Sequence, residues 1–181
     1  MKNQKNKKIR NATSTKIKGI TFKSQTEKTI YKTLLEQGIE PKYEPHTFVL
    51  WEGFTPITPF YDQETNTQQD KRNALINAER KLPKILVPKN EKVIGIRYTP
   101  DFYFRVDNLD VWIEAKGFEN DVFYIKKKLF RKFLDDRFLE SGQKSIFFEI
   151  YTKRQLLQAL DIIKEYANSI TENESTSAKS S

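Results

Sequence analysis

Three residues in the middle of the chain have side chains that together could hydrolyse a phosphodiester: Asp101, Glu114 and Lys116. Two carboxylates on neighbouring segments repel each other unless a cation lies between them. A hard divalent ion, Mg²⁺ or Mn²⁺, binds carboxylates, waters and phosphate oxygens, and it lowers the pKa of a bound water. We therefore expect Asp101, Glu114 and the carbonyl of Ala115 to be metal ligands. Lys116 is placed to hold the attacking water or the pentacoordinate phosphate.

These residues lie on two expected strands that form a hairpin. If Val106 lies opposite Val111, Asp101 faces Lys116 across the hairpin. Because side chains alternate along a strand, the two acids and the lysine share one face. The other face is entirely apolar, which predicts the core side: Phe102, Phe104, Val106, Val111, Ile113 and Ala115.

The rest of the pattern predicts helix, three strands, helix, strand and helix. Ser24 can cap the first helix, with Glu27 at the capping-box spacing, and Gly38 ends it. The further expected elements are strands over 42–51, 93–106 and 111–117, a helix over about 121–140 with Val122, Ile125, Leu129 and Phe133 as its apolar stripe, a strand over 145–151 and a helix after Thr152. This order predicts an α/β fold in which helices flank a mixed central sheet.

The expected domain organisation is one domain over 19–168 with an insertion at about 52–92 between the first two core strands. Prolines interrupt that insertion, and only 69–81 has a helical pattern. Residues 1–18 are expected to be a flexible basic arm, and 169–181 an unstructured polar tail.

Composition limits the chemistry. The chain has no cysteine and one histidine, which excludes disulfides and thiolate metal sites and argues against imidazole-based zinc chemistry. No apolar run approaches the roughly 18 residues of a membrane helix, and no secretion signal is evident, so we expect an intracellular protein that is neither secreted nor membrane-bound. The formal charge of +8 favours a nucleic-acid partner, although a Lys-, Asn- and Ile-rich vocabulary can equally reflect an AT-rich genome. A homodimer is compatible with the sequence, but no segment signals one.

A run of basic residues in the helix after the acids is the expected nucleic-acid contact: Lys126, Lys127, Lys128, Arg131 and Lys132. A charge run is more often a solvated helix face, but this one begins a few residues after Gly117, close to the expected site.

The motif residues resemble those of the PD-(D/E)xK, or restriction-endonuclease-like, nuclease superfamily. Thr99-Pro100-Asp101 followed by Glu114-Ala115-Lys116-Gly117 is similar to its signature, and the order of elements is similar to its αβββαβ core. The chain is most similar to small phage-encoded endonucleases, which also share Ser24 with Glu27, Tyr43-Glu44-Pro45 and Tyr98 to Phe102; the similarity covers about 24–151. It implies that Asp101 and Glu114 bind metal, that Lys116 is catalytic and that Glu27 is an accessory acid. It further implies a Mg²⁺-dependent endonuclease acting on DNA, in the host cytoplasm if the protein is phage-encoded.

Other interpretations of the same residues remain. Asp101, Glu114 and Lys116 could form an exposed ion pair worth less than about 1 kcal/mol. Glu27 could serve only its own helix, and a catalytic role for Glu44 or His46 is the less favoured interpretation. The protein could also be a nucleic-acid-binding or virion-associated protein that has lost cleavage, or the nuclease subunit of a recombination or transposition complex.

Overall fold

The structure is a computed structural model, and it describes residues 16–117 and 121–177. The chain divides into two compact units. One contains the residues up to Leu50 together with those from Arg97 onward, and the other is Trp51–Ile96. Each unit is described by itself.

The centre of the first unit is a four-stranded sheet in the order β10-β9-β8-β3. It consists of β3 (Lys42–Tyr43), β8 (Phe102–Val106), β9 (Leu109–Ala115) and β10 (Lys144–Ile150). β8 is antiparallel to both β3 and β9, whereas β10 is parallel to β9. The sheet is therefore mixed, and the predicted α/β class is confirmed.

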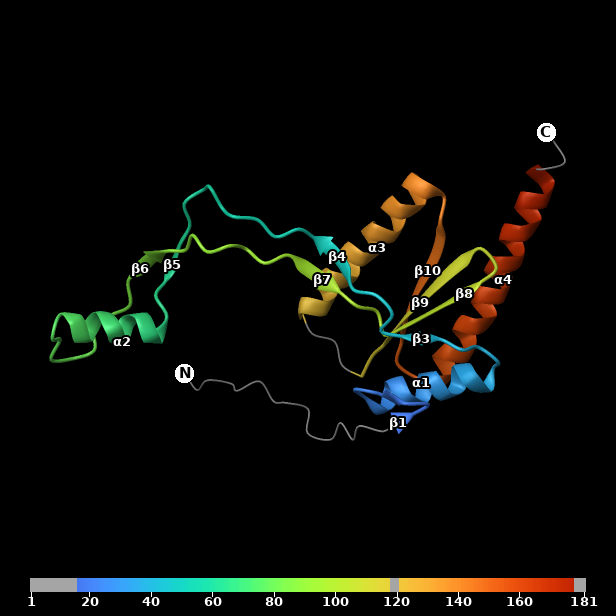
Figure 1. Ribbon diagram of the computed structural model, residues 1–181, viewed down its shortest axis with the longest axis horizontal. Coiled ribbons are helices and arrows are strands. Elements are labelled where there is room, and N and C mark those ends of the chain that lie inside the picture. The colour runs from blue at the N-terminus through green and yellow to red at the C-terminus, as the bar shows by residue number, and fades with distance from the viewer. Residues whose placement is uncertain (1–15, 118–120, 178–181) are drawn as a thin grey trace. The chain divides into compact units, whose positions relative to one another are not determined.

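Helices cover both faces of this sheet (Figure 1). α1 (Gln25–Glu36) and α4 (Lys153–Ser177) pack on one face, where the larger core includes Phe102, Val111 and Ile113. α3 (Asp121–Ser141) packs on the other face over a second core of mainly aromatic side chains. Both faces are covered because a parallel strand pair needs a crossover, and α3 provides the one between β9 and β10.

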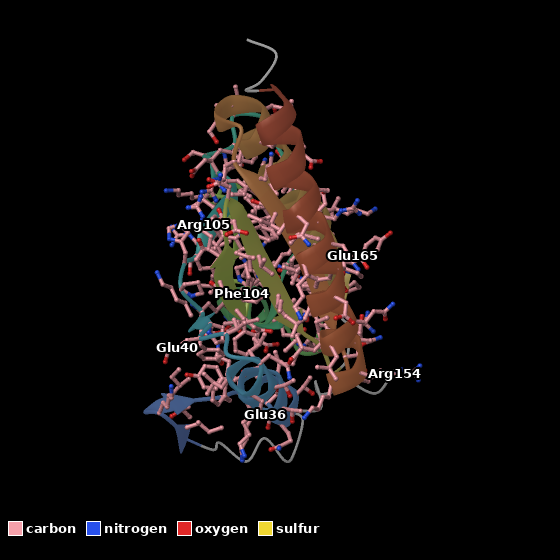
Figure 2. The ribbon with its side chains drawn as sticks, turned by 90° about the vertical axis from the view of Figure 1, so that its right-hand side faces the viewer. Glu36, Glu40, Phe104, Arg105, Arg154 and Glu165 are labelled. Carbon is pink, nitrogen blue, oxygen red and sulfur yellow. The ribbon has the colours of Figure 1, made fainter. Side chains whose placement is uncertain are left out.

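The predicted alternation along β8 is confirmed. Phe104 is buried in the core beneath α4, whereas its neighbour Arg105 is exposed (Figure 2). The predicted apolar face also forms the core, with Phe102, Val111 and Ile113 fully buried. The hydrophobic pattern of the hairpin therefore predicts correctly which side chains share a face.

The predicted register of this hairpin is wrong by two residues. Val106 lies opposite Leu109, not Val111. The turn is shorter than expected because Asp107 adopts a left-handed φ of 49°, which aspartate tolerates, so that two residues suffice where four were expected. A shift of two leaves every side chain on its predicted face but changes its cross-strand partner.

Two predicted strands are interrupted. The segment 42–51 forms β3 and, after a break at residues 44–47, β4 (Phe48–Trp51). Likewise 93–106 forms β7 (Ile96–Tyr98) and β8, and β4 pairs with β7 in a separate two-stranded sheet. Pro45 and Pro100 lie in the breaks, where a residue without an N–H cannot continue a ladder.

The apolar stripe predicted for α3 is partly wrong. Val122 and Ile125 are 62% and 54% exposed, while Phe123, Phe130 and Leu134 are buried. The larger aromatic rings at 123 and 130, seven residues apart, determine which face turns inward.

At both ends, part of the segment expected to lack regular structure forms a strand or a helix. β1 (Lys16–Ile17) pairs with β2 (Ile20–Thr21), and Ile17 packs against the core. At the other end, α4 continues to Ser177 because Ile170 extends its buried stripe beyond Ile163 and Ala167. Residues 1–15 of the predicted arm and 178–181 of the predicted tail lie outside the described residues.

No helix within the described ranges has the length and apolarity that crossing a bilayer requires.

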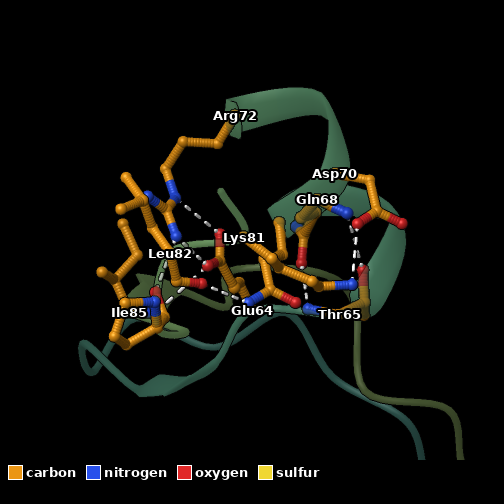
Figure 3. Close-up of polar contacts among 10 residues, drawn as sticks. Glu64, Thr65, Gln68, Asp70, Arg72, Lys81, Leu82 and Ile85 are labelled. Carbon is orange, nitrogen blue, oxygen red and sulfur yellow. Dashed lines mark hydrogen bonds and ion pairs between the residues drawn. The ribbon is translucent and has the colours of Figure 1, made fainter. Parts of the chain in front are cut away.

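The second unit, Trp51–Ile96, pairs β5 (Tyr61–Gln63) with β6 (Leu86–Pro88) around α2 (Asn66–Leu75). Thr65 and Gln68 form a capping box, so the helix begins before residue 69, where the sequence pattern placed its start. The centre of this unit is polar. The Arg72 guanidinium donates to the buried Glu64 carboxylate at 2.7 and 3.2 Å, and the Ile85 N–H donates to the same carboxylate (Figure 3). Among the described residues, none of the buried hydrophobic side chains comes from this unit.

Candidate active site

The three residues singled out from the sequence line one cavity of about 540 Å³ in the first unit. Its walls come from the segment before α1, the break between β3 and β4, β7, the ends of β8 and β9, and the first turns of α3. The segments that interrupt the predicted strands therefore form part of the walls.

Asp101 lies immediately before β8, at the mouth of the hairpin. Because Phe102 pairs with Ile113, the next position along brings Asp101 beside Glu114, not beside Lys116 as predicted. The Ala115 N–H donates to Asp101 Oδ2 at 2.7 Å and fixes that carboxyl group. Burial and the negative charge of Glu114 raise the pKa of Asp101 to about 8. The two acids therefore interact strongly enough for one of them to retain a proton at neutral pH.

Glu114 is buried on β9 and has a partner at each oxygen. The Tyr98 hydroxyl donates to Oε2 at 2.6 Å, and the Lys116 ammonium lies 2.6 Å from Oε1. Burial, with the negative charge of Glu114, raises the pKa of Tyr98 far above its ordinary value, so this hydroxyl is a donor throughout the accessible pH range.

Lys116 lies between Glu114 and an aromatic ring. Its ammonium nitrogen is 3.2 Å from the centre of the Phe123 ring on α3, and only 12% of its side chain is exposed. A buried ammonium needs such partners, and here the carboxylate and the ring supply them. The interaction is thus a buried ion pair, unlike the exposed pair that was the alternative interpretation.

Glu27 on α1 lies near the site without lining the cavity. Ser24 caps the helix by accepting from the Glu27 N–H at 3.1 Å. The Glu27 carboxylate accepts from the Lys23 N–H at 2.9 Å and from the Tyr43 hydroxyl at 2.6 Å. Its negative charge also contributes to the raised pKa of Asp101. Glu27 therefore holds the first helix to the sheet and acts on the site through its charge.

The basic run on α3 divides between different surroundings. Lys126 lines the cavity, whereas Lys127 forms an ion pair with Glu149 of β10 at 2.8 Å. The other three, Lys128, Arg131 and Lys132, border a separate depression together with two acids of the same helix, and Lys132 pairs with Asp136 at 2.7 Å. Of the five predicted contacts, one therefore lies at the cavity.

Several further residues belong to the cavity wall. Tyr98, Arg97 and Lys23 were given no role from the sequence, although Tyr98 belongs to the motif Tyr98 to Phe102. Glu44 also lines the cavity: it pairs with Lys23, and its N–H donates to the Asp101 carbonyl at 2.8 Å. No periodic pattern marks these positions, because they lie in short segments whose direction is set by the surrounding packing.

Three nearby aromatic residues, His46, Tyr103 and Trp112, do not line this cavity. His46 packs against the Phe48 ring, 4.6 Å between ring centres. Trp112 and Tyr103 share the strand face of the acids, but Trp112 is buried against Phe48, and its ring packs tilted against Tyr103 with 4.4 Å between ring centres. These aromatic rings therefore contribute to packing and not to the lining of the cavity.

The donor set matches a hard cation in kind. The two acids offer carboxylate oxygens, and Mg²⁺ commonly binds through one or two carboxylates, with waters and phosphate oxygens completing its shell. Among the described residues, no group of three or more His, Cys, Asp or Glu side chains could hold a metal ion. Any ion bound here would therefore depend on water or substrate for most of its ligands.

Comparison of the chain with protein-family models, curated proteins and solved structures finds no match.

Proposed function

We propose that this chain is a metal-dependent nuclease of the PD-(D/E)xK superfamily that hydrolyses phosphodiester bonds, with DNA as the preferred substrate. The observation that carries the proposal is the interacting pair of acids, half-buried Asp101 and buried Glu114, beside Lys116 in a cavity that cationic side chains also line. A protein with no use for a cation at this point has no reason to hold two interacting acids together in a partly buried site.

The raised pKa of Asp101 supports a role in metal binding. A carboxyl group with a pKa of about 8 carries an energetic penalty when it ionises, and a divalent cation held by the acids would offset that penalty. When bound, the ion supplies an activated water and neutralises charge developing on the phosphorus. Asp101 and Glu114 are the proposed ligands, with the Ala115 carbonyl as a further candidate.

Groups of the chain itself orient the two acids and supply a positive charge for the phosphate. The Ala115 N–H fixes Asp101, and the Tyr98 hydroxyl fixes one oxygen of Glu114. Lys116, paired with Glu114, is the proposed catalytic cation that stabilises the phosphate during attack. Glu27 is proposed to act through its charge on Asp101.

The sheet is compatible with the restriction-endonuclease-like core. Antiparallel β3, β8 and β9 are followed by α3 and then by β10, which is parallel to β9, and α1 precedes them. Trp51–Ile96 would then be an insertion between the first two core strands.

The test is incubation of the whole protein with supercoiled, linear, branched and single-stranded DNA and with RNA, in Mg²⁺ or in EDTA. We expect cleavage in Mg²⁺ only, lost in Asp101→Asn and in Lys116→Ala. Asp136→Asn is the matched control because this exposed acid lies on α3 away from the cavity. Equal cutting by wild type and Asp101→Asn would refute the site assignment. Binding without any product, in a folded protein, would instead favour the interpretation as a binding protein that has lost cleavage.

A further inference from the structure

The candidate active-site cavity contains more cations than acids. Its charged lining comprises three acids and four bases: Glu44, Asp101 and Glu114 against Lys23, Arg97, Lys116 and Lys126. An acidic metal site alone would repel a nucleic acid, so the arrangement of the four bases determines whether a polyanion can approach.

Two of the four bases are engaged by acids of the cavity. Lys116 pairs with Glu114, and Lys23 pairs with Glu44, which raises the pKa of the Lys23 ammonium. Each pair is close to neutral in total, so neither adds much to the attraction of an incoming phosphate.

Arg97 and Lys126 are different, because neither has an ion-pair partner among the residues that the structure describes. Arg97 is exposed on β7, and Lys126 is half-buried near the start of α3. They thus come from separate elements, and against the one remaining acid, Asp101, they give the lining a formal excess of one positive charge. A guanidinium can also bind a phosphate through two hydrogen bonds.

The same cavity wall offers neutral donors. The hydroxyls of Thr47 and Thr99 lie 2.6 Å apart, and both threonines line the cavity. Threonine hydroxyls and arginine and lysine side chains are among the groups that contact nucleic-acid backbones, and such contacts fix the position of the strand without reading its bases.

We propose that Arg97 and Lys126 are the phosphate-binding residues of this protein. They hold the sugar–phosphate backbone of one nucleic-acid strand on either side of the phosphodiester bond that Asp101 and Glu114 would cleave. The proposal rests on the proposed function and deepens it, because it names the contacts and limits them to backbone phosphates. It also assigns Lys128, Arg131 and Lys132, on the same helix, no part in the contact.

The test is binding of fluorescently labelled oligonucleotides to the full chain in EDTA, where no cleavage occurs, over a series of KCl concentrations. Single-stranded DNA, the corresponding duplex and single-stranded RNA are compared. Variants are Arg97→Ala, Lys126→Ala and the double substitution. Lys132→Ala is the control, because it removes the same charge from the same helix away from the cavity.

We expect the double substitution to weaken binding about tenfold and to lower the slope of log affinity against log salt by roughly 1.5, with each single variant giving about half that change. Lys132→Ala should leave the slope unchanged. An unchanged slope in the double variant, or an equal loss in Lys132→Ala, would overturn the proposal. So would a mononucleotide that binds as tightly as the oligonucleotide, because the site would then be a small-molecule pocket.

The outcome is separable from that of the proposed function. If wild type cuts DNA and Asp101→Asn does not, the nuclease proposal stands whatever Arg97 and Lys126 contribute. If wild type cuts nothing but the double variant loses its salt-dependent binding, the phosphate contact stands and the catalytic proposal fails.

Discussion

The Tyr98 hydroxyl donates a hydrogen bond of 2.6 Å to Glu114 Oε2, inside the wall of the cavity that holds Asp101. Tyr98 belongs to β7 and Glu114 to β9, two strands of different sheets. This bond therefore links the segment before the break at Pro100 to the central sheet, and it fixes the rotamer of a proposed metal ligand.

Tyr98→Phe should reduce cleavage and Mg²⁺ affinity by about tenfold or more, the usual effect of removing a hydrogen bond that orients a metal ligand. The ring remains, so its packing against Phe130 should persist and the fold should survive. Cleavage rates over a Mg²⁺ titration, with circular dichroism as the check on folding, measure the effect. Tyr124→Phe is the control, since Tyr124 is 51% exposed on α3. Full activity of Tyr98→Phe at every Mg²⁺ concentration would mean that the bond is structural only.

The raised pKa of Asp101 predicts how stability depends on pH without metal. In the unfolded chain this carboxyl group titrates near 3.8, and in the folded protein at about 8. Between these values the folded protein retains a proton that the unfolded chain has released, so its contribution to stability falls as the pH rises and is fully lost above about 8. We expect the melting temperature in EDTA to fall over this window, and Asp101→Asn to flatten the curve. A wild-type curve identical to that of Asp101→Asn would show that Asp101 ionises freely.

The stabilisation that Mg²⁺ gives should increase with pH, whereas the stability of the metal-free protein falls. Because binding requires the ionised carboxylate, the ion competes with the proton on Asp101. The rise in melting temperature on adding Mg²⁺ should therefore be small near pH 5 and largest at pH 8 and above, and it should be absent from Asp101→Asn. The same melting series with Ca²⁺ in place of Mg²⁺ shows whether a second hard divalent ion stabilises the protein through the same carboxylates. A Mg²⁺ effect independent of pH would place the ion elsewhere.

Part of this site follows from the sequence. The face shared by Asp101, Glu114 and Lys116 depends only on strand parity, which the apolar residues at alternate positions fix. The partner of Asp101 does not follow, because it depends on whether the turn at Asp107 takes two residues or four. Tyr98 and Arg97 were missed for a related reason: they lie on a strand of three residues that pairs with β4, not with its neighbour in sequence. Tertiary packing, with no local periodicity, sets such contacts.

The unit at Trp51–Ile96 should depend on the ion pair of Glu64 and Arg72. Glu64 is 2% exposed, and its other partner, the Ile85 N–H, carries no charge that could replace the guanidinium. Arg72→Met should therefore open this unit and expose it to limited proteolysis, because an unpaired carboxylate would remain buried. Glu64→Gln with Arg72→Met should be cut more slowly than Arg72→Met alone. Equal cutting of both variants and the wild type would mean that the unit is held by other contacts.

Gly53 and Gly95 lie where the two chain segments of this unit pass close to each other. A Cβ at Gly95 would lie 2.5 Å from the Trp51 carbonyl oxygen and 2.8 Å from the Gly53 nitrogen, and one at Gly53 would lie 2.6 Å from the Val93 carbonyl oxygen. All of these are backbone atoms, which cannot turn aside as a flexible side chain can. Gly95→Ala should therefore separate the strands and break the paired hydrogen bonds between Phe54 and Val93, at 3.0 and 2.8 Å.

Hydrogen exchange at the Phe54 and Val93 amides measures this directly. In Gly95→Ala we expect both amides to exchange at least tenfold faster than in wild type, while amides of β9 in the central sheet keep their protection. Gly117→Ala is the matched control for exchange, because a Cβ there meets no atom within 4 Å. Unchanged protection at both amides in Gly95→Ala would show that the two segments have room for a side chain, and the close approach would then not explain why glycine occupies either position.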